Sequence, residues 1–333
     1  YMEKEEEINS LLVETYNLTQ EIIDTYRVCN NRIVIKEVRG KKRLFVQIVL
    51  EGKPVPKRKA DGSFRHTLGT GKIGGDIGTQ SVALCSKDIV KLKNLAERSH
   101  KSTFALERDI ANLQRSLDRS RRATNPKNYK EDGTIIKGKK TWIKSNRYKS
   151  KQKKLRELQR KASESRKYAT NEDVNYVRSL GDVLIIEKMQ IQALQKKSKE
   201  VTKNKKGRFN KRKRFGKSIL NRCPGYFISQ CKYRFGISGG SVKEVNTWTF
   251  KASQYDHKID ACNKKSLSKR WHVFDDGTKV QRDIYSSFLL LCSNNELTAP
   301  DKTMCDKLFE QFLINHDICI ENIKKNKIKV LNS

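Results

Sequence analysis

The chain has 333 residues, a length that suits about two domains. Its 72 Lys and Arg residues outnumber 37 Asp and Glu residues, and the formal charge of +35 indicates a polyanionic partner, with nucleic acid as the first choice. An anionic membrane surface is the second choice, but no apolar run of about 18 residues exists to span a bilayer. Hydrophobic residues, 36% of the chain, gather in clear segments, which excludes a wholly disordered protein.

The first 71 residues contain one helical and one β-rich segment. Apolar residues recur with a period of about 3.6 over residues 3–29 and predict an amphipathic helix. Residues 32–50 read as two β-prone runs on either side of Gly40, which predicts a β-hairpin. Residues 53–71 are polar and contain two prolines and three glycines, so we predict a loop there, with a domain boundary as one interpretation.

Short strands and then two long helices are expected from residue 72 onward. Residues 73–92 predict two or three strands, because short apolar runs alternate with glycine and polar residues. Residues 97–122 and 147–170 each show an apolar stripe at helical spacing. The segment between them contains proline and glycine, which favours an antiparallel helical hairpin inserted into an α/β domain.

Apolar and basic segments alternate in the rest of the chain. Residues 183–187 predict a buried strand that ends at Glu187. Residues 196–217 hold 12 Lys or Arg residues against one acid, with Phe209 and Phe215 between them, a composition that favours binding to a nucleic-acid strand over a merely solvated face. The remaining predictions are a helix over 219–233, a strand over 241–250, an irregular polar segment over 251–279, a helix over 282–292 and a helix around 304–313.

Three carboxylates follow apolar or β-prone runs: Asp76 in Ile-Gly-Gly-Asp-Ile-Gly, Glu187 after Val-Leu-Ile-Ile, and Asp283 in Gln-Arg-Asp-Ile-Tyr. Carboxylates in such positions can converge at one edge of a sheet. Together they would suit divalent metal ions that act on a phosphodiester. Taken singly, each is open to a simpler interpretation as a solvated carboxylate, and Asp283 as a helix N-cap.

These three segments, in this order and with the inserted basic hairpin, resemble the RuvC-type motifs of the RNase H-like fold. They resemble in particular the TnpB (OrfB) proteins of bacterial insertion sequences, relatives of the small type V CRISPR effectors. Asp76 matches the aspartate of the first motif, Glu187 the glutamate of the second and Asp283 the aspartate of the third. The resemblance covers roughly residues 32–292 and is specific as a set rather than motif by motif.

The resemblance implies an α/β fold class with an RNase H-like (RuvC) domain. The domains expected from it are a helix over 1–30 as the remnant of a recognition lobe, a wedge-type partial β-barrel over 31–71, the RuvC-like domain over 72–299 with a helical hairpin over 97–170 and a degenerate zinc ribbon over 251–279, and a basic tail over 300–333.

The activity that the resemblance implies is RNA-guided cleavage of DNA with Mg²⁺ or Mn²⁺ at Asp76, Glu187 and Asp283. The expected partners are a guide RNA and target DNA, with no membrane and no small-molecule substrate, in the bacterial cytoplasm. The residues expected to contact nucleic acid are Arg208, Lys211, Arg212, Arg214, Arg115 and Arg119.

Two departures from the family pattern affect these expectations. The family carries paired Cys-x-x-Cys sequences before the third motif, whereas here His257, Cys262 and His272 are irregularly spaced, so we predict that zinc is not bound. Most of the eight cysteines are expected to be small buried hydrophobes instead. Only about 30 residues precede the predicted β-hairpin, so the chain is expected to be a fragment or a reduced variant.

Two alternative functions stay open at this point. One is a catalytically inactive or truncated relative that binds RNA or DNA without cutting it, for example as a repressor. The other is a DNA-joining transposase, which would need strand-transfer machinery that the sequence does not display.

Overall fold

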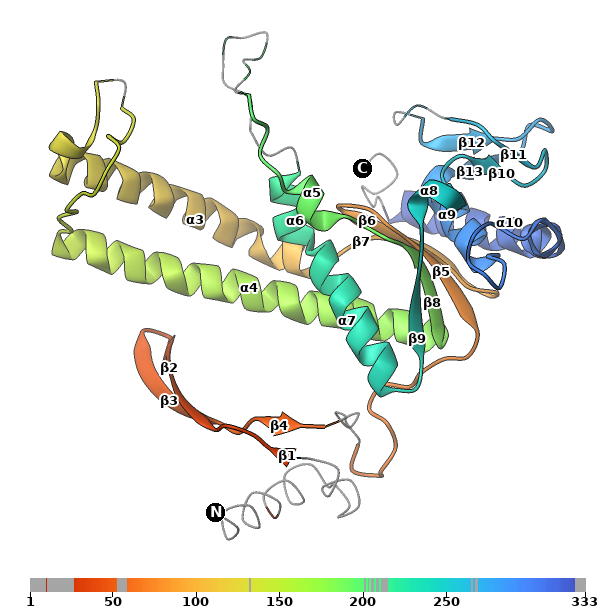
Figure 1. Ribbon diagram of the computed structural model, residues 1–333, viewed down its shortest axis with the longest axis horizontal. Helices are drawn as coiled ribbons and strands as arrows, with labels where there is room; N and C mark the ends of the chain where they lie inside the picture. The colour runs from red at the N-terminus through yellow and green to blue at the C-terminus, as the bar shows by residue number, and fades with distance from the viewer. Residues whose placement is uncertain are drawn as a thin grey trace. The chain divides into compact units, whose positions relative to one another are not determined.

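The computed structural model describes residue 10, residues 27–52, 59–131, 133–200, 202, 204, 207, 210, 215–264, 266 and 269–326 (Figure 1). Most of the predicted helix over 3–29 therefore lies outside the described residues. The chain divides into two compact units, one made of Tyr1–Lys57 with Lys101–Ser165 and the other of Arg58–His100 with Arg166–Ser333. Each unit is described by itself below.

The predicted β-hairpin is present in the first unit. Strands β2 (Arg32–Val38) and β3 (Lys41–Gln47) pair antiparallel. Arg39 and Gly40 form the turn between them with positive φ angles of 51° and 75°, which is the backbone that a two-residue hairpin turn favours. Two further strands, β1 (Arg27–Val28) and β4 (Leu50–Glu51), also pair antiparallel, so the end of the predicted N-terminal helix is wrong.

The predicted helical hairpin is also present. It consists of α3 (Glu97–Thr124), the short 3-10 turn η1 (Pro126–Asn128) and α4 (Asn146–Leu180). Its loop is closed by the side-chain amide of Asn125, which accepts from the backbone N–H of Ile143 at 2.7 Å and donates to the carbonyl of Ile143 at 3.0 Å. Helix α4 continues past residue 170, where we expected its end, because Val174 and Val177 are buried in the second unit.

A five-stranded mixed sheet forms the centre of the second unit, which makes the chain a mixed α/β protein. The strand order is β7-β6-β5-β8-β9. Strands β5, β6 and β7 pair antiparallel, whereas β8 pairs parallel with both β5 and β9. The bounds are Lys72–Ile77 for β5, Ser81–Cys85 for β6, Val90–Asn94 for β7, Val183–Glu187 for β8 and Ser241–Val245 for β9.

Successive residues of the strands alternate between two hydrophobic cores. Val82 and Leu84 of β6 pack with the end of α4 and with α7 (Pro224–Ile237), while Ala83 and Cys85 pack with α9 (Arg282–Leu291) and α10 (Lys302–Lys325). This alternation follows from the two-residue period of a β-strand. The sheet therefore lies between helical layers, and both of its faces are buried.

The chain between β8 and α9 forms shorter elements. These are α5 (Ile191–Leu194), α6 (Gly216–Arg222), α8 (Thr247–Phe250), β10 (Tyr255–Asp256), β11 (Ala261–Cys262), β12 (Trp271–Val273) and β13 (Lys279–Gln281). Five of the eight cysteines are buried and all eight are free thiols, in line with the expectation that most are small core residues. Within the described part of the chain, none of the helices combines the length and the apolar character that a bilayer crossing needs.

Candidate active site

Asp76, Glu187 and Asp283 line one pocket of about 580 Å³ in the second unit. Asp76 lies on the central strand β5, Glu187 is the last residue of β8, and Asp283 lies in the first turn of α9. The structure thus brings together three carboxylates that lie far apart in the sequence. The other residues that line the pocket are Gly78, Thr79, Gln80, Ser81, Phe215, Ser253, Gln254, Lys264, Arg270, Arg282 and Ser286.

The strand register brings Asp76 next to Glu187. In the parallel pair of β5 and β8, Gly75 lies opposite Ile186, and each carboxylate follows directly on its member of this pair. Neighbouring strands lie about 4.8 Å apart, and paired positions point to the same face of a sheet. The two carboxylates therefore leave the same end of the sheet side by side.

Gly74 brings helix α9 against the same strand. A Cβ atom at Gly74 would lie 1.9 Å from the carbonyl oxygen of Ser287 and 2.4 Å from the backbone nitrogen of Leu291. Only glycine allows the two backbones to approach so closely. Because Asp283, Ser287 and Leu291 are spaced by four residues, they lie on one face of α9, the face that meets β5. This packing turns Asp283 toward the end of β5, where Asp76 lies.

The first turn of α9 is capped by Gln281 and not by Asp283. The side-chain oxygen of Gln281 accepts from the backbone N–H of Ile284 at 2.7 Å, and its amide nitrogen donates to the Asp283 carboxylate at 3.3 Å. The simpler interpretation of Asp283 as an N-cap is therefore wrong. The backbone N–H of Gln281 in turn donates to Nε2 of the buried His316 on α10 at 3.0 Å, which fixes the start of α9 to a second helix.

Two carboxylates of the pocket, Asp76 and Glu187, have pKa values raised mainly by burial. Burial raises the pKa of Asp76 well above its ordinary value, and the charges of Asp283 and Glu187 raise it further, against a smaller opposing effect of Arg282. Burial also raises the pKa of Glu187, while a backbone hydrogen bond from Ala252 acts in the opposite direction. A group of carboxylates in a poorly hydrated site favours either a bound proton or a bound cation.

Three basic side chains line the same pocket: Lys264, Arg270 and Arg282. Arg282 donates from Nη2 to Oδ1 of Asp283 at 3.1 Å. In the sequence, Arg282 stands out only as the neighbour of Asp283, and Lys264 and Arg270 belong to no motif. Both of these lie in loops, where no local periodicity marks a residue as part of a site.

The donor chemistry of the pocket fits a hard divalent cation, because carboxylate oxygens are the ligands that Mg²⁺ and Mn²⁺ prefer. In the described residues, however, no group of three or more His, Cys, Asp or Glu side chains is already arranged to hold a metal ion. Arg282 pairs with Asp283 at 3.1 Å, so a guanidinium already lies at the oxygens of this carboxylate. Asp76, Glu187 and Asp283 fit such a metal by donor type, and all three line the pocket.

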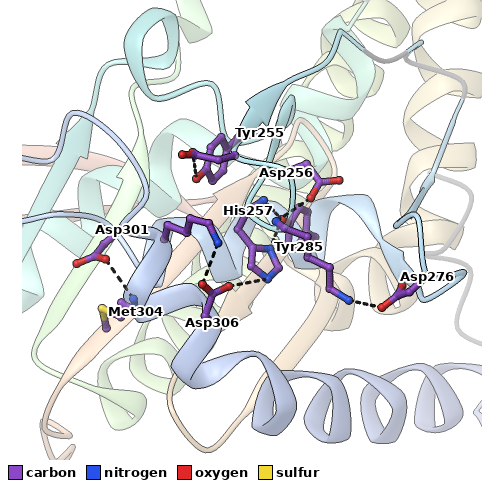
Figure 2. A network of polar contacts seen from close by, with 11 residues as sticks. Tyr255, Asp256, His257, Asp276, Tyr285, Asp301, Met304 and Asp306 are labelled. Carbon is purple, nitrogen blue, oxygen red and sulfur yellow. Dashed lines mark hydrogen bonds and ion pairs between the residues drawn. The ribbon is translucent and has the colours of Figure 1, made fainter.

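The segment expected to be irregular, residues 251–279, contains three short strands and a buried polar network (Figure 2). His257 and His272 are only 1% and 4% exposed. Nδ1 of His257 lies 2.7 Å from the hydroxyl of Tyr285, and Nε2 of His272 lies 2.9 Å from Oδ2 of Asp256. These pairs, which join residues distant in sequence, explain why the segment is more ordered than its polarity indicates.

The prediction that the protein binds no zinc concerns residues in and near this network, and it can be tested by measuring zinc in the purified protein. His257 and His272 hydrogen-bond or pair with protein groups, and Cys262 is exposed at the edge of β11. We expect purified protein to contain far less than one zinc per chain, measured by elemental mass spectrometry after dialysis. A stoichiometric zinc that disappears in Cys262→Ser or His272→Ala, but stays in a Cys29→Ser control, would overturn this prediction.

The residues expected to bind nucleic acid fall into two groups. Arg115 and Arg119 are exposed on α3, and among the described residues neither takes part in an ion pair. Arg208, Lys211, Arg212 and Arg214 lie outside the described residues, as does Phe209. Phe215, at the end of the same basic tract, lines the pocket.

The chain is similar to solved structures of known proteins, but its sequence matches none of the families and curated proteins compared with it. No protein-family model and no curated protein sequence matches the chain. A Cas12f1–sgRNA–target DNA complex matches with a TM-score of 0.46 and 12% identity over 86% of this chain and 50% of that one. The mini-RNA-guided endonuclease Cas-phi3 matches with a TM-score of 0.36 and 14% identity over 83% of this chain and 53% of that one. The chain thus spans about half the length of these proteins.

Proposed function

We propose that the chain is a metal-dependent DNA endonuclease with an RNase H-like (RuvC-type) domain, guided by RNA in the manner of TnpB. One observation carries the nuclease part of the proposal. Three carboxylates from β5, β8 and α9 meet at a single pocket in a protein with a net charge of +35. An acidic pocket on a very basic protein suits a cation that works on a bound polyanion.

The acidic and the basic residues that line the pocket would have different roles. Asp76, Glu187 and Asp283 would hold a pair of Mg²⁺ or Mn²⁺ ions, which when bound activate the attacking water and stabilise the charge that develops on the phosphate. Lys264 and Arg270 would bind phosphate oxygens of the strand. Arg282 would hold the Asp283 carboxylate in place in the absence of metal, through the 3.1 Å ion pair.

RNA guidance is the more specific claim within the proposal, and it rests on the resemblance of the three motifs to those of TnpB. In RNA-guided nucleases, base pairing reads the target while the protein holds the heteroduplex by its backbone. The exposed Arg115 and Arg119 and the basic tract over 196–217 supply charges of the required kind. Neither group of residues needs to read the base sequence.

A second candidate function is binding without cleavage. The observation that favours it is the same ion pair between Arg282 and Asp283, together with the lack of a preassembled metal shell among the described residues. Cleavage of end-labelled plasmid by protein purified with its co-expressed RNA separates the two functions. We expect cuts with Mg²⁺ or Mn²⁺ and none with chelator. Intact plasmid under every divalent metal, with RNA and a matched target present, would leave only the binding function.

The basic tract allows a further test of the nucleic-acid interface. Replacing Arg208, Lys211, Arg212 and Arg214 with alanine should weaken binding and flatten the plot of log affinity against log salt. The slope should fall by roughly 0.9 for each duplex phosphate that the protein no longer neutralises. Filter binding or fluorescence anisotropy at several salt concentrations measures this slope.

The matched control removes the same number of positive charges from residues that already pair with carboxylates: Arg122, Arg160, Lys232 and Lys302. We expect a smaller change in slope for this control, because its side chains are occupied within the protein. Equal slopes for the wild type and the tract variant would show that the tract is only a solvated surface.

A further inference from the structure

Trp248 is held out into solvent by a short helix. Its side chain is 82% exposed, whereas Val245, Phe250 and Ala252 around it are each 1% exposed and belong to one core. The side chain of Asn246 caps α8 by accepting from the backbone N–H of Trp248 at 3.0 Å. Buried residues on both sides and a cap therefore fix the backbone of Trp248 while its indole ring contacts solvent.

The helix that carries Trp248 begins and ends at the candidate active site. Val245 is the register partner of Glu187 at the end of β8 and β9, and α8 follows β9 directly (Figure 1). At the other end, Ala252 contributes a backbone hydrogen bond to the Glu187 carboxylate, and Ser253 lines the pocket. Three residues reach at most about 11 Å, so the Cα atom of Trp248 lies within that distance of Val245.

The charges around Trp248 suit a polyanion. Lys188, whose carbonyl accepts from the Thr247 hydroxyl at 3.4 Å, and Lys251, the C-cap of α8, are both exposed. No acidic residue occurs between Val245 and Lys251. The acid that precedes this stretch, Glu244, already pairs with Lys232 at 2.8 Å. An exposed aromatic ring flanked by cations is the usual composition of a surface that binds single-stranded nucleic acid.

We infer that Trp248 is a stacking platform for an unpaired base of the strand that occupies the pocket. The assignment rests on the proposed function, which it extends by naming the form of the substrate. Bases within a duplex are already stacked on one another and offer no free face to the ring. A platform next to the cleavage pocket therefore selects a single strand, held by its phosphates at Lys188 and Lys251 and by one base on Trp248.

The test compares three full-length proteins for binding to a short oligothymidylate at several salt concentrations. We expect Trp248→Ala to raise Kd by roughly 5- to 100-fold, which corresponds to the loss of one stacked base. Trp248→Phe should restore much of the affinity, because it keeps a ring. The salt slope should stay as in the wild type, since the change removes no charge. Tyr233→Ala, at an aromatic residue 50% exposed on α7, is the matched control and should bind like the wild type.

A second readout reports the ring directly. The chain has three tryptophans, so Trp142→Phe combined with Trp271→Phe leaves Trp248 as the only one. Its emission should be quenched by oligothymidylate and not by an abasic strand of the same length. An unchanged Kd in Trp248→Ala, in a wild type that binds and cleaves, would overturn the stacking role alone and indicate a protein partner for the ring. A wild type that does not bind single strands would overturn the nuclease proposal as well.

Discussion

Asp76→Asn is expected to reduce DNA cleavage by about 1,000-fold or more. The substitution keeps the shape of the side chain and removes one of the three charges proposed to hold the metal ions. A bound metal contributes several kcal/mol to the stabilisation of a phosphoryl transition state, and each 1.36 kcal/mol is a factor of ten in rate. Rates of plasmid nicking under single-turnover conditions measure the loss. Asp88→Asn, at an exposed carboxylate between β6 and β7, is the matched control and should cleave normally.

Binding and catalysis should separate in this variant. Because the proposed affinity for nucleic acid rests on many Lys and Arg contacts, we expect Asp76→Asn to bind almost as tightly as the wild type. Glu187→Ala and Asp283→Ala should behave in the same way. Double variants should be no worse than single ones, because the three carboxylates act as one unit. A variant that loses affinity in proportion to activity would contradict this account of Asp76.

The stability of Asp76→Asn should change in the direction opposite to its activity. Because burial and its neighbours raise the pKa of Asp76 above the ordinary 3.8, its protonated form contributes stability that is present below pH 3.8 and lost as the pH rises through the raised value. In chelator at neutral pH, the variant should therefore melt at a higher temperature than the wild type. Added Mg²⁺ should stabilise the wild type and leave the variant unchanged. Equal melting curves from pH 4 to neutral pH would refute the electrostatic argument.

Gly74→Ala should destabilise the second unit by about 3 kcal/mol or more, because the new methyl group meets backbone atoms of α9 and no side chain can move aside. The distance of 1.9 Å to the Ser287 carbonyl requires the whole helix to shift. Since α9 carries Asp283, cleavage should fall together with stability. Urea unfolding followed by circular dichroism measures the first effect and plasmid nicking the second.

Gly236→Ala is the control for this change. A Cβ atom at Gly236 would meet no other atom within 4 Å, and the residue lies in helix α7. Alanine at a helical position is neutral or stabilising by up to about 1 kcal/mol relative to glycine. An unfolding midpoint for Gly74→Ala equal to that of Gly236→Ala would show that α9 does not pack on β5 as described.

The elements that could be predicted from the sequence are those with a strong local pattern. The hairpin of β2 and β3 combines β-prone runs with an Arg-Gly turn, and the strand before Glu187 is a continuous apolar run. The predicted ends of α4 and α10 come too early. In α10, buried residues continue from Cys305 to Ile323, but charged and amide residues between them weaken the apolar pattern beyond residue 313.

In the candidate site, too, only the residues with a local sequence pattern could be predicted. The proximity of the three carboxylates could be expected, because each ends or follows an apolar or β-prone run, and all three line one pocket. Lys264 and Arg270 could not be predicted, because they come from a loop whose path depends on tertiary contacts. The histidines expected in an open loop are buried against residues distant in sequence. His257 lies within hydrogen-bonding distance of the Tyr285 hydroxyl, 28 residues away, and His272 pairs with Asp256, 16 residues away.

The order of the elements has a consequence for the timing of synthesis. Strands β5, β6 and β7 are neighbours in sequence, whereas the pocket also needs Asp283, which is translated 207 residues after Asp76. A ribosome that adds 5–20 residues per second needs about 10–40 s for that interval. The basic helices α3 and α4 are complete well before it ends. An emerging chain therefore carries much of its positive charge before the third carboxylate of the candidate site has been made.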